Sequence, residues 1–266
     1  MSMTTMANPV TRNSERRAPS SLSPIFSFAL ANLKGSLKNR ALMAVALLTP
    51  AMLILIFWLM SGAGQSSEFD IFRFIYPGIV VFTVIQTGGM HATTIVNWRE
   101  QQIFRRLACT PVPLWKLVLG RSLSQLVLSL IQAFIIILMG ALLLREVLSP
   151  FVVLTATLIL TLSSACFIAL GTIIAALSPN ATIANTVYVF LIIPLLFLGD
   201  SMLPEDLLPR VLQRIGDFLP TAMTTDLVRP LLLEGIIPTG ALLPIAGLLF
   251  YTLFFVLLSA RMFRWE

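Results

Sequence analysis

Six long apolar segments dominate the hydrophobic pattern of the chain. They cover residues 41–60, 74–96, 123–144, 151–177, 183–198 and 242–258. A helix needs about 20 apolar residues to cross the hydrocarbon core of a bilayer, and each segment approaches that length. The pattern therefore predicts an all-α integral membrane protein with six transmembrane helices. The first segment follows 40 mostly polar residues and is too long for the apolar part of a cleavable signal peptide, so we expect it to be a span.

A shorter amphipathic stretch precedes the first span. One apolar stripe runs along it at helical spacing, and polar residues lie opposite: Phe26, Leu30, Leu33 and Leu37 against Asn32, Lys34 and Lys38. This stripe predicts an interfacial amphipathic helix over residues 23–40, ahead of a six-span domain over residues 41–266. The alternative is an N-terminal extension of the first span. Residues 1–22 are polar and rich in Ser, Thr and Arg, which predicts a disordered cytoplasmic tail.

Composition excludes a water-soluble globular domain. Hydrophobic residues make up 57% of the chain and charged residues only 11%, against about 25% charged in an ordinary soluble domain. The net charge of +6 does not indicate a nucleic-acid-binding protein, because the basic residues flank the apolar segments. Cys109 and Cys166 lie far apart, so neither a disulfide framework nor a cysteine-rich metal site is expected.

The distribution of Lys and Arg predicts the sidedness of the spans. A cytoplasmic N-terminus places 13 of the 18 basic residues inside, in agreement with the usual excess of basic residues in cytoplasmic loops. The inner residues are Arg12, Arg16, Arg17, Lys34, Lys38, Arg40, Arg99, Arg105, Arg106, Lys116, Arg121, Arg261 and Arg264, and the outer ones are Arg73, Arg145, Arg210, Arg214 and Arg229. We therefore expect a multi-pass protein of the cell (plasma or inner) membrane with both termini in the cytoplasm.

Few polar side chains lie within the apolar segments. None of these segments contains Asp or Glu, whereas carriers driven by ions or protons usually use a buried titratable group. His91 is the single histidine of the chain, and it follows Thr83 and Thr87 on one helix face. The candidate residues for a translocation path are Thr83, Gln86, Thr87, His91, Gln132, Asn185 and Tyr188. Hydrogen bonding between packed helices is the alternative, and for the stripe through His91 it is the interpretation we favour.

Catalytic signatures are missing from the sequence. It contains neither H-E-x-x-H nor G-x-S-x-G, and a single histidine offers no plausible zinc cluster, so we expect no catalytic residue and no metal site. The P-loop pattern G-x-x-x-x-G-K-[ST] is also absent. The chain is therefore not expected to be an enzyme, and if ATP drives it, another polypeptide binds the nucleotide.

The polar stretch between the second and third spans carries a recognisable motif. Residues 97–112 read N-W-R-E-Q-Q-I-F-R-R-L-A-C-T-P-V. This resembles the same region in permease subunits of the type-2 ATP-binding-cassette (ABC) exporters, where R-E-x-G-T-L-x-R-L-x-x-T-P-V is typical. The matching residues are Arg99, Glu100, Arg106, Leu107, Thr110, Pro111 and Val112, whereas Gln102, Ile103 and Phe104 replace the Gly-Thr-Leu step.

A second motif lies ahead of the sixth span. Residues 218–235 contain Asp226-Leu-Val-Arg229-Pro230 and resemble the drug-resistance and nodulation-factor export branches of that family. Residues 196–204 resemble the short break after the fifth span, although Asp200 stands where a small residue is more usual. Asp226 and Arg229 are three residues apart, which predicts a structural pair on one helix. The segment 199–235 is expected outside, either re-entering the outer leaflet or lying on the surface; within it, Leu207 to Leu219 predict one apolar helix face.

The resemblance implies a coupling helix over about residues 97–108 that sits in a cleft of a separate P-loop ATPase subunit. The residues expected there are Trp98, Arg99, Glu100, Ile103, Phe104, Arg105, Arg106 and Leu107, with the apolar ones as anchors and the charged ones pairing around the cleft. An amphipathic helix resting on anionic head groups is the alternative. The resemblance also implies two ATPase copies, a second permease copy in a homodimer, and no cofactor in this chain, because ATP and Mg²⁺ bind to the ATPase.

The expected function is export of a hydrophobic or amphipathic small molecule, such as a drug or antibiotic, with multidrug resistance as one outcome. Spans rich in Leu, Ile, Val, Phe and Met suit such a cargo. Export of a lipid-linked glycan or lipo-oligosaccharide by the same architecture is one alternative. A proton-coupled secondary transporter that uses His91 is the alternative from another class.

Overall fold

Long apolar helices account for most of the structure. The computed structural model describes residues 23–63, 71–108, 113–146 and 148–262. Six helices in these ranges are long and apolar enough to cross a membrane: α2 (Arg40–Ala63), α3 (Ile71–Glu100), α5 (Leu114–Leu144), α6 (Pro150–Leu177), α7 (Ala181–Leu198) and α10 (Leu242–Met262). The predicted all-helical architecture with six spans is confirmed.

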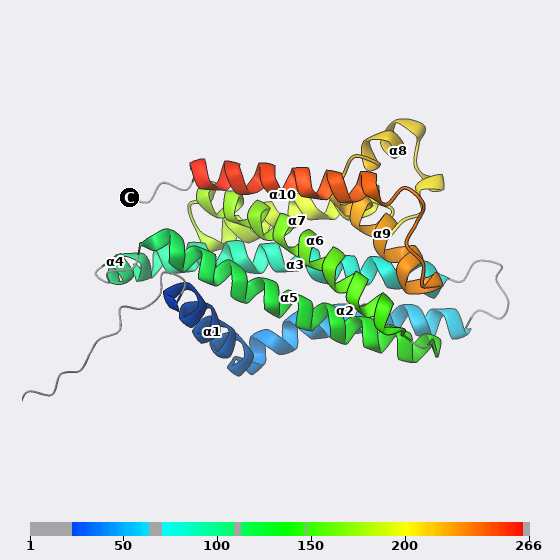
Figure 1. Cartoon of the computed structure of the whole chain (residues 1–266), viewed down its shortest axis with the longest axis horizontal. Coiled ribbons are helices and arrows are strands. Elements are labelled where there is room, and N and C mark those ends of the chain that lie inside the picture. The colour runs from blue at the N-terminus through cyan, green and yellow to red at the C-terminus, as the bar shows by residue number, and fades with distance from the viewer. Residues whose placement is uncertain (1–22, 64–70, 109–112, 147, 263–266) are drawn as a thin grey trace, which may run out of the picture.

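Shorter elements connect and flank these helices. They are α1 (Ser23–Lys38), α4 (Ile103–Ala108), the 3-10 helix η1 (Glu205–Leu207), α8 (Arg210–Gly216) and α9 (Pro220–Glu234). α1 is separated from α2 at Asn39 and runs in a different direction, packing against α5 (Figure 1). The end of the bundle that holds α1 and α4 also holds the last turn of α10, and α8 lies at the opposite end (Figure 1).

Local capping explains where two of the long helices begin. The Ser149 hydroxyl accepts a hydrogen bond from the Val152 backbone N–H at 3.2 Å, and Pro150 occupies the first turn of α6. The Asn180 side-chain oxygen accepts from the Ile183 N–H at 2.8 Å and starts α7 three residues after α6 ends. These caps hold the α6–α7 connection to a tight turn.

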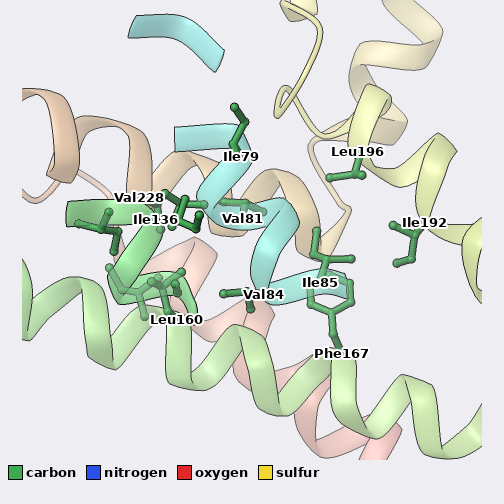
Figure 2. Close-up of a cluster of buried hydrophobic side chains, with 14 of the residues drawn as sticks. Ile79, Val81, Val84, Ile85, Ile136, Leu160, Phe167, Ile192, Leu196 and Val228 are labelled. Atoms are coloured by element: carbon green, nitrogen blue, oxygen red, sulfur yellow. The ribbon is translucent and has the colours of Figure 1, made fainter. Parts of the chain in front are cut away.

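α3 is the central helix of the bundle. It packs against α2, α5, α6, α7 and α9, and 72% of its most apolar stretch is buried, compared with 6% for α10. Figure 2 shows four of its side chains, Ile79, Val81, Val84 and Ile85, among residues from neighbouring helices: Ile136, Leu160, Phe167, Ile192, Leu196 and Val228. Peripheral helices instead expose apolar side chains, as membrane-spanning helices do where they meet lipid or another subunit.

Glycines allow α3 and α6 to cross at close range. A β-carbon at Gly171 would lie 2.2 Å from the carbonyl oxygen of Gly88, and a β-carbon at Gly88 would lie 2.3 Å from both the Phe167 carbonyl oxygen and the Tyr188 hydroxyl. Small residues permit this approach of two backbones in a membrane bundle, where packing rather than water drives helix association. The crossing therefore depends on the absence of these two side chains.

The segment between α7 and α10 contains two different environments. Leu207 and Val211 are exposed, and η1 and α8 are separate short elements because Pro209 begins a new helical turn. The predicted apolar residues from Leu207 to Leu219 are therefore divided between two short elements and do not form one continuous helix, and their place in the outer leaflet or on the surface stays a prediction. The helix that enters the bundle is α9, which packs against α3, α6, α7 and α10 and buries Thr221, Thr224 and Thr225 completely.

Three further predictions fall outside the described residues. They concern the tail over residues 1–22, Cys109, and the Thr110, Pro111 and Val112 part of the first motif. Leu107 lies in α4, but its side chain is likewise not described.

Candidate functional site

The candidate coupling segment is a sharp turn between α3 and α4. α3 ends at Glu100, and α4 begins at Ile103. Between them Gln102 adopts the left-handed conformation with a φ of 56°. Glycine adopts this conformation at little cost, which explains why glycine is typical at this position of the motif. Gln102 preserves the turn without the glycine.

Two charged residues of the motif tie the end of α3 to the α6–α7 turn. The Arg99 guanidinium donates hydrogen bonds to the carbonyl oxygens of Ala175, at 3.4 Å, and Ser178. A carboxylate oxygen of Glu100 accepts from the Ala181 backbone N–H at 3.0 Å, at the N-terminus of α7. A negative charge is favourable there because the helix dipole is positive at that end. These bonds link the end of α3 to the end of α6 and the start of α7.

The aromatic residues of the segment pack within the chain. Trp98 contacts Phe28 of α1 edge-on, with ring centroids 5.9 Å apart, and Phe104 of α4 at 6.1 Å. Such pairs add about 0.5–1.5 kcal/mol to the burial of their area. The side chains of Arg105 and Arg106 are exposed on α4. The segment therefore joins α1, α3 and α4 into one unit with positive charge on its outer side.

The candidate path residues lie in different environments. Thr83 and Thr87 are buried, and their hydroxyls donate to the Ile79 and Val84 carbonyl oxygens of α3 itself at 2.8 and 2.6 Å. The Tyr188 hydroxyl donates to the Ile85 carbonyl oxygen at 2.5 Å. Three of the seven residues are thus held in bonds within and between helices.

The remaining path candidates differ in burial and in hydrogen bonding. His91 is completely buried, with Nε2 3.4 Å from the Ser122 hydroxyl. Gln132 is buried too, and its amide nitrogen has no hydrogen-bond partner among the described residues. Gln86 is half-buried, whereas Asn185 is exposed on α7. The structure places Thr83 and Thr87 on the central helix α3, bonds Tyr188 of α7 to that helix, and leaves Asn185 on the surface of the single chain.

The motif over residues 226–230 forms an ion pair that differs from the predicted one. The guanidinium of Arg229 donates to a carboxylate oxygen and to the backbone carbonyl oxygen of Asp200, and not to Asp226. The Arg229 guanidinium also lies over the Phe74 ring, 4.2 Å from its centroid. Asp200 itself has a left-handed φ of 50°, which Asp tolerates better than most residues. The Asp226–Arg229 pair is therefore corrected to an Asp200–Arg229 pair between the end of α7 and α9, because tertiary packing places that carboxylate over the guanidinium.

Asp226 is left with several negative neighbours. Asp226 is exposed on α9, so its carboxyl loses only part of its water; this partial desolvation and, secondly, the negative charge of Asp200 raise the pKa of Asp226 from 3.8 to about 6, although Arg229 acts in the opposite direction. The pKa of Glu205 is also raised, mainly by desolvation and then by Asp200. This end of the bundle thus carries an acidic cluster around one Arg, which the sequence showed only as scattered acids.

Sequence reasoning missed one polar cluster inside the other end of the bundle. The third span begins earlier than predicted, at Trp115 instead of residue 123, and so includes Arg121. Arg121 was taken as part of the cytoplasmic flank, but it is only 5% exposed, and Gln125 one turn later is fully buried. Their spacing of four residues was the available signal, because it places both on one helix face.

Together, the fold and these clusters define a polytopic helical membrane protein. Its central helix α3 is tied at one end to the α6–α7 turn and is followed there by the short basic helix α4. Comparison with known proteins identifies the family. Residues 24–233 match the family described as ABC-2 type transporter, and the chain belongs to this family.

Similar proteins include two nodulation proteins. The chain is 35% identical over 75 residues to Nodulation protein J of Rhizobium leguminosarum bv. viciae. The aligned stretch covers 28% of this chain and 29% of that protein. The chain is also 34% identical over 80 residues to Nodulation protein J of Neorhizobium galegae. This aligned stretch covers 30% of the chain and 30% of that protein. These matches span less than a third of the length of either relative.

Proposed function

We propose that the chain is the membrane permease subunit of an ATP-driven exporter in the cell membrane. The observation that carries this proposal is the α3–α4 junction, where Arg99 and Glu100 tie the end of α3 to the α6–α7 turn, two residues before the short basic helix α4 begins. A partner that pushes on α4 moves three helices at once. Membership of the ABC-2 type transporter family supports the same reading, since a P-loop ATPase then supplies the push.

The end of the bundle that bears α4 is proposed to face the cytoplasm. The charged residues described at that end are basic with the exception of Glu100: Lys34, Lys38, Arg40, Arg99, Arg105, Arg106, Lys116, Arg121 and Arg261. The opposite end bears the acidic cluster around Asp200. This asymmetry supports cytoplasmic termini, because basic residues accumulate on the cytoplasmic side of membrane proteins.

ATP hydrolysis belongs to the partner in this proposal. Two P-loop ATPase subunits, which carry ATP and Mg²⁺, contact the α4 segments of two permease copies. Exposed Arg105 and Arg106 meet acidic groups of the ATPase, and the cluster of Trp98, Phe104 and Phe28 passes the displacement on to α1. Closure of the ATPases tilts the spans and opens a path toward the outside.

The path is proposed to lie between two copies of the chain. α7 supports this placement, because only 22% of it is buried in one chain and Phe190 is 80% exposed. Asn185 is exposed on the same helix, so pairing of two copies through α7 places polar groups in an otherwise apolar interface. The remaining candidate path residues then lie behind this interface, in the interior of each copy: Thr83, Gln86, Thr87, His91, Gln132 and Tyr188.

The cargo is proposed to be a hydrophobic or amphipathic small molecule of the drug or antibiotic type. A second candidate is a lipo-oligosaccharide, which the similarity to two nodulation proteins favours. Both cargoes are amphiphiles that enter from the inner leaflet, so the architecture serves either one.

The coupling proposal is tested with the full chain co-expressed with a P-loop ATPase from the same cell that co-purifies with it. The double variant Arg105→Glu/Arg106→Glu is expected to lower the affinity between the two subunits on the order of tenfold and to reduce ATP turnover in proteoliposomes, because it reverses the charge that meets the ATPase. The matched control is Lys34→Glu/Lys38→Glu, which reverses two exposed charges at the same end on α1. Equal ATP turnover and affinity in both double variants would refute the coupling role of α4.

A further inference from the structure

A large cavity lies between α1, α3 and α5 at the end of the bundle that bears α4. Its volume is about 640 Å³. α1 contributes Phe28, α3 contributes Trp98 and Thr94, and α5 contributes Arg121 and Gln125. None of the seven candidate path residues lines it. The cavity is therefore a feature of the single chain that the proposed transport path does not use.

The α5 wall of the cavity presents buried polar groups whose hydrogen-bonding capacity is used only in part. Arg121 is only 5% exposed, and its guanidinium donates long hydrogen bonds of 3.3 Å to the hydroxyls of Ser124 and Thr94. The Arg121 Nε and both side-chain amide atoms of Gln125 are buried, and they find no partner among the described residues. Buried polar atoms are nearly always paired, so three unpartnered ones beside a cavity point to a polar ligand group as their partner.

The charge of Arg121 defines the chemistry of that group. Among the described residues, no carboxylate forms an ion pair with Arg121. An unpaired charge within a membrane-spanning helix is costly, and such residues pair with an opposite charge or mark a binding site. The planar guanidinium favours two-point contacts with phosphate or carboxylate oxygens, and the Gln125 amide adds a further donor.

The remaining walls of the cavity indicate an amphiphile. Phe28, Met90, Trp98 and Leu128 give it an apolar lining next to the polar groups. α1 exposes Phe26 and Leu37 and carries Lys34 and Lys38, as a helix at the level of lipid head groups does. A ligand with a charged head and an apolar tail matches both parts of the cavity.

We propose that this cavity binds the phosphate-bearing head group of an amphiphile taken from the adjacent leaflet, with Arg121 and Gln125 as the recognition residues. The Arg121 guanidinium pairs with the phosphate oxygens, and the Gln125 amide donates to them. The tail leaves the cavity along α1 into the lipid. The site is independent of ATP and of the ATPase, so its failure and the failure of the coupling proposal are separate results.

The test measures ligand binding to the purified full chain by native mass spectrometry in a neutral detergent. The probes are phosphatidylglycerol, dodecyl phosphate, inorganic phosphate and diacylglycerol. Phosphatidylglycerol and diacylglycerol share their tails, so the difference between them reports the head group. Binding of dodecyl phosphate as well as phosphatidylglycerol means that any phosphate amphiphile, cargo included, fits the site, and binding of phosphatidylglycerol alone assigns it to membrane lipid.

Three variants assign the binding to the cavity. Arg121→Gln is expected to weaken phosphatidylglycerol binding at least tenfold, and Gln125→Leu about threefold or more, because each removes donors to the phosphate. Lys116→Gln is the matched control: it removes a basic charge from the same helix, and Lys116 lies outside the cavity beside Trp115. The affinity of the Lys116→Gln variant for phosphatidylglycerol is expected to stay within about twofold of that of the original chain.

The outcomes separate clearly. Equal binding by Arg121→Gln, Gln125→Leu and Lys116→Gln would overturn the proposal, as would equal affinity for diacylglycerol or for inorganic phosphate. If Arg121→Gln does not give a folded chain, Gln125→Leu alone decides, since it retains the charge and the hydrogen bonds of Arg121.

Discussion

The substitution Gly171→Ala tests the close crossing of α3 and α6 on which the bundle is built. The added β-carbon would lie 2.2 Å from the Gly88 carbonyl oxygen, whereas ordinary van der Waals contact begins at 3.4 Å. The next nearest atoms also belong to the Gly88 backbone, at 2.9 and 3.3 Å, so no flexible side chain is available to move away. The two helices therefore have to separate by about 1 Å, and every contact along their shared face is weakened.

The expected cost follows from overpacking of a tight core, which is typically about 1–3 kcal/mol. Gly35→Ala is the matched control, because a β-carbon at Gly35 in α1 meets nothing within 4 Å. Both variants exchange the same atoms in a helix and share the better helix propensity of Ala, about 1 kcal/mol. The difference between them isolates the clash.

The assay is thermal unfolding of the two purified variants in the same detergent and at the same heating rate. For a chain of this size each kcal/mol moves the midpoint by about 2–4 °C, so Gly171→Ala is expected to unfold about 2–12 °C below Gly35→Ala. A fixed heating rate matters, because membrane proteins often unfold irreversibly and the midpoint then depends on it. Midpoints within about 1 °C of each other would refute the close crossing.

Two further predictions concern the acidic cluster at the opposite end of the bundle from α4. Asp200→Asn is expected to lower the free energy of unfolding by about 1–3 kcal/mol, measured by thermal unfolding, because it removes the charged partner of half-buried Arg229 and keeps a residue that tolerates the left-handed φ. Asp226→Asn is expected to raise the unfolding midpoint above pH 6 and to leave it unchanged near pH 4. The raised pKa of Asp226 means that its ionised form destabilises the folded chain, so the stability present below pH 3.8 is lost as the pH rises to about 6.

Each of these predictions has a control and an opposing result. Asp206→Asn makes the same change in the same segment at an exposed side chain, and it is expected to move the midpoint by less than Asp200→Asn. Equal effects of the two would show that the Asp200–Arg229 pair adds no stability. For Asp226→Asn, a midpoint difference from the original chain that stays constant from pH 4 to pH 8 would contradict the raised pKa.

The sequence by itself determined the six-span architecture and contained the two motifs that resemble those of ABC exporters. Span length depends on bilayer thickness and on local apolar content, so all six helices were predicted from residues adjacent in the chain. The helix over Ser23–Lys38 followed from local periodicity in the same way. Coupling, path and cargo stay predictions, because they depend on partners that a single chain does not contain.

Only the tertiary structure decided which polar groups meet. Arg229 pairs with Asp200, 29 residues earlier, instead of with its helix neighbour Asp226, because α7 and α9 are brought together by packing. Arg121 became a buried residue because α1 covers the beginning of α5. Such pairings depend on the positions of helices distant in sequence, and periodicity carries no information about those positions.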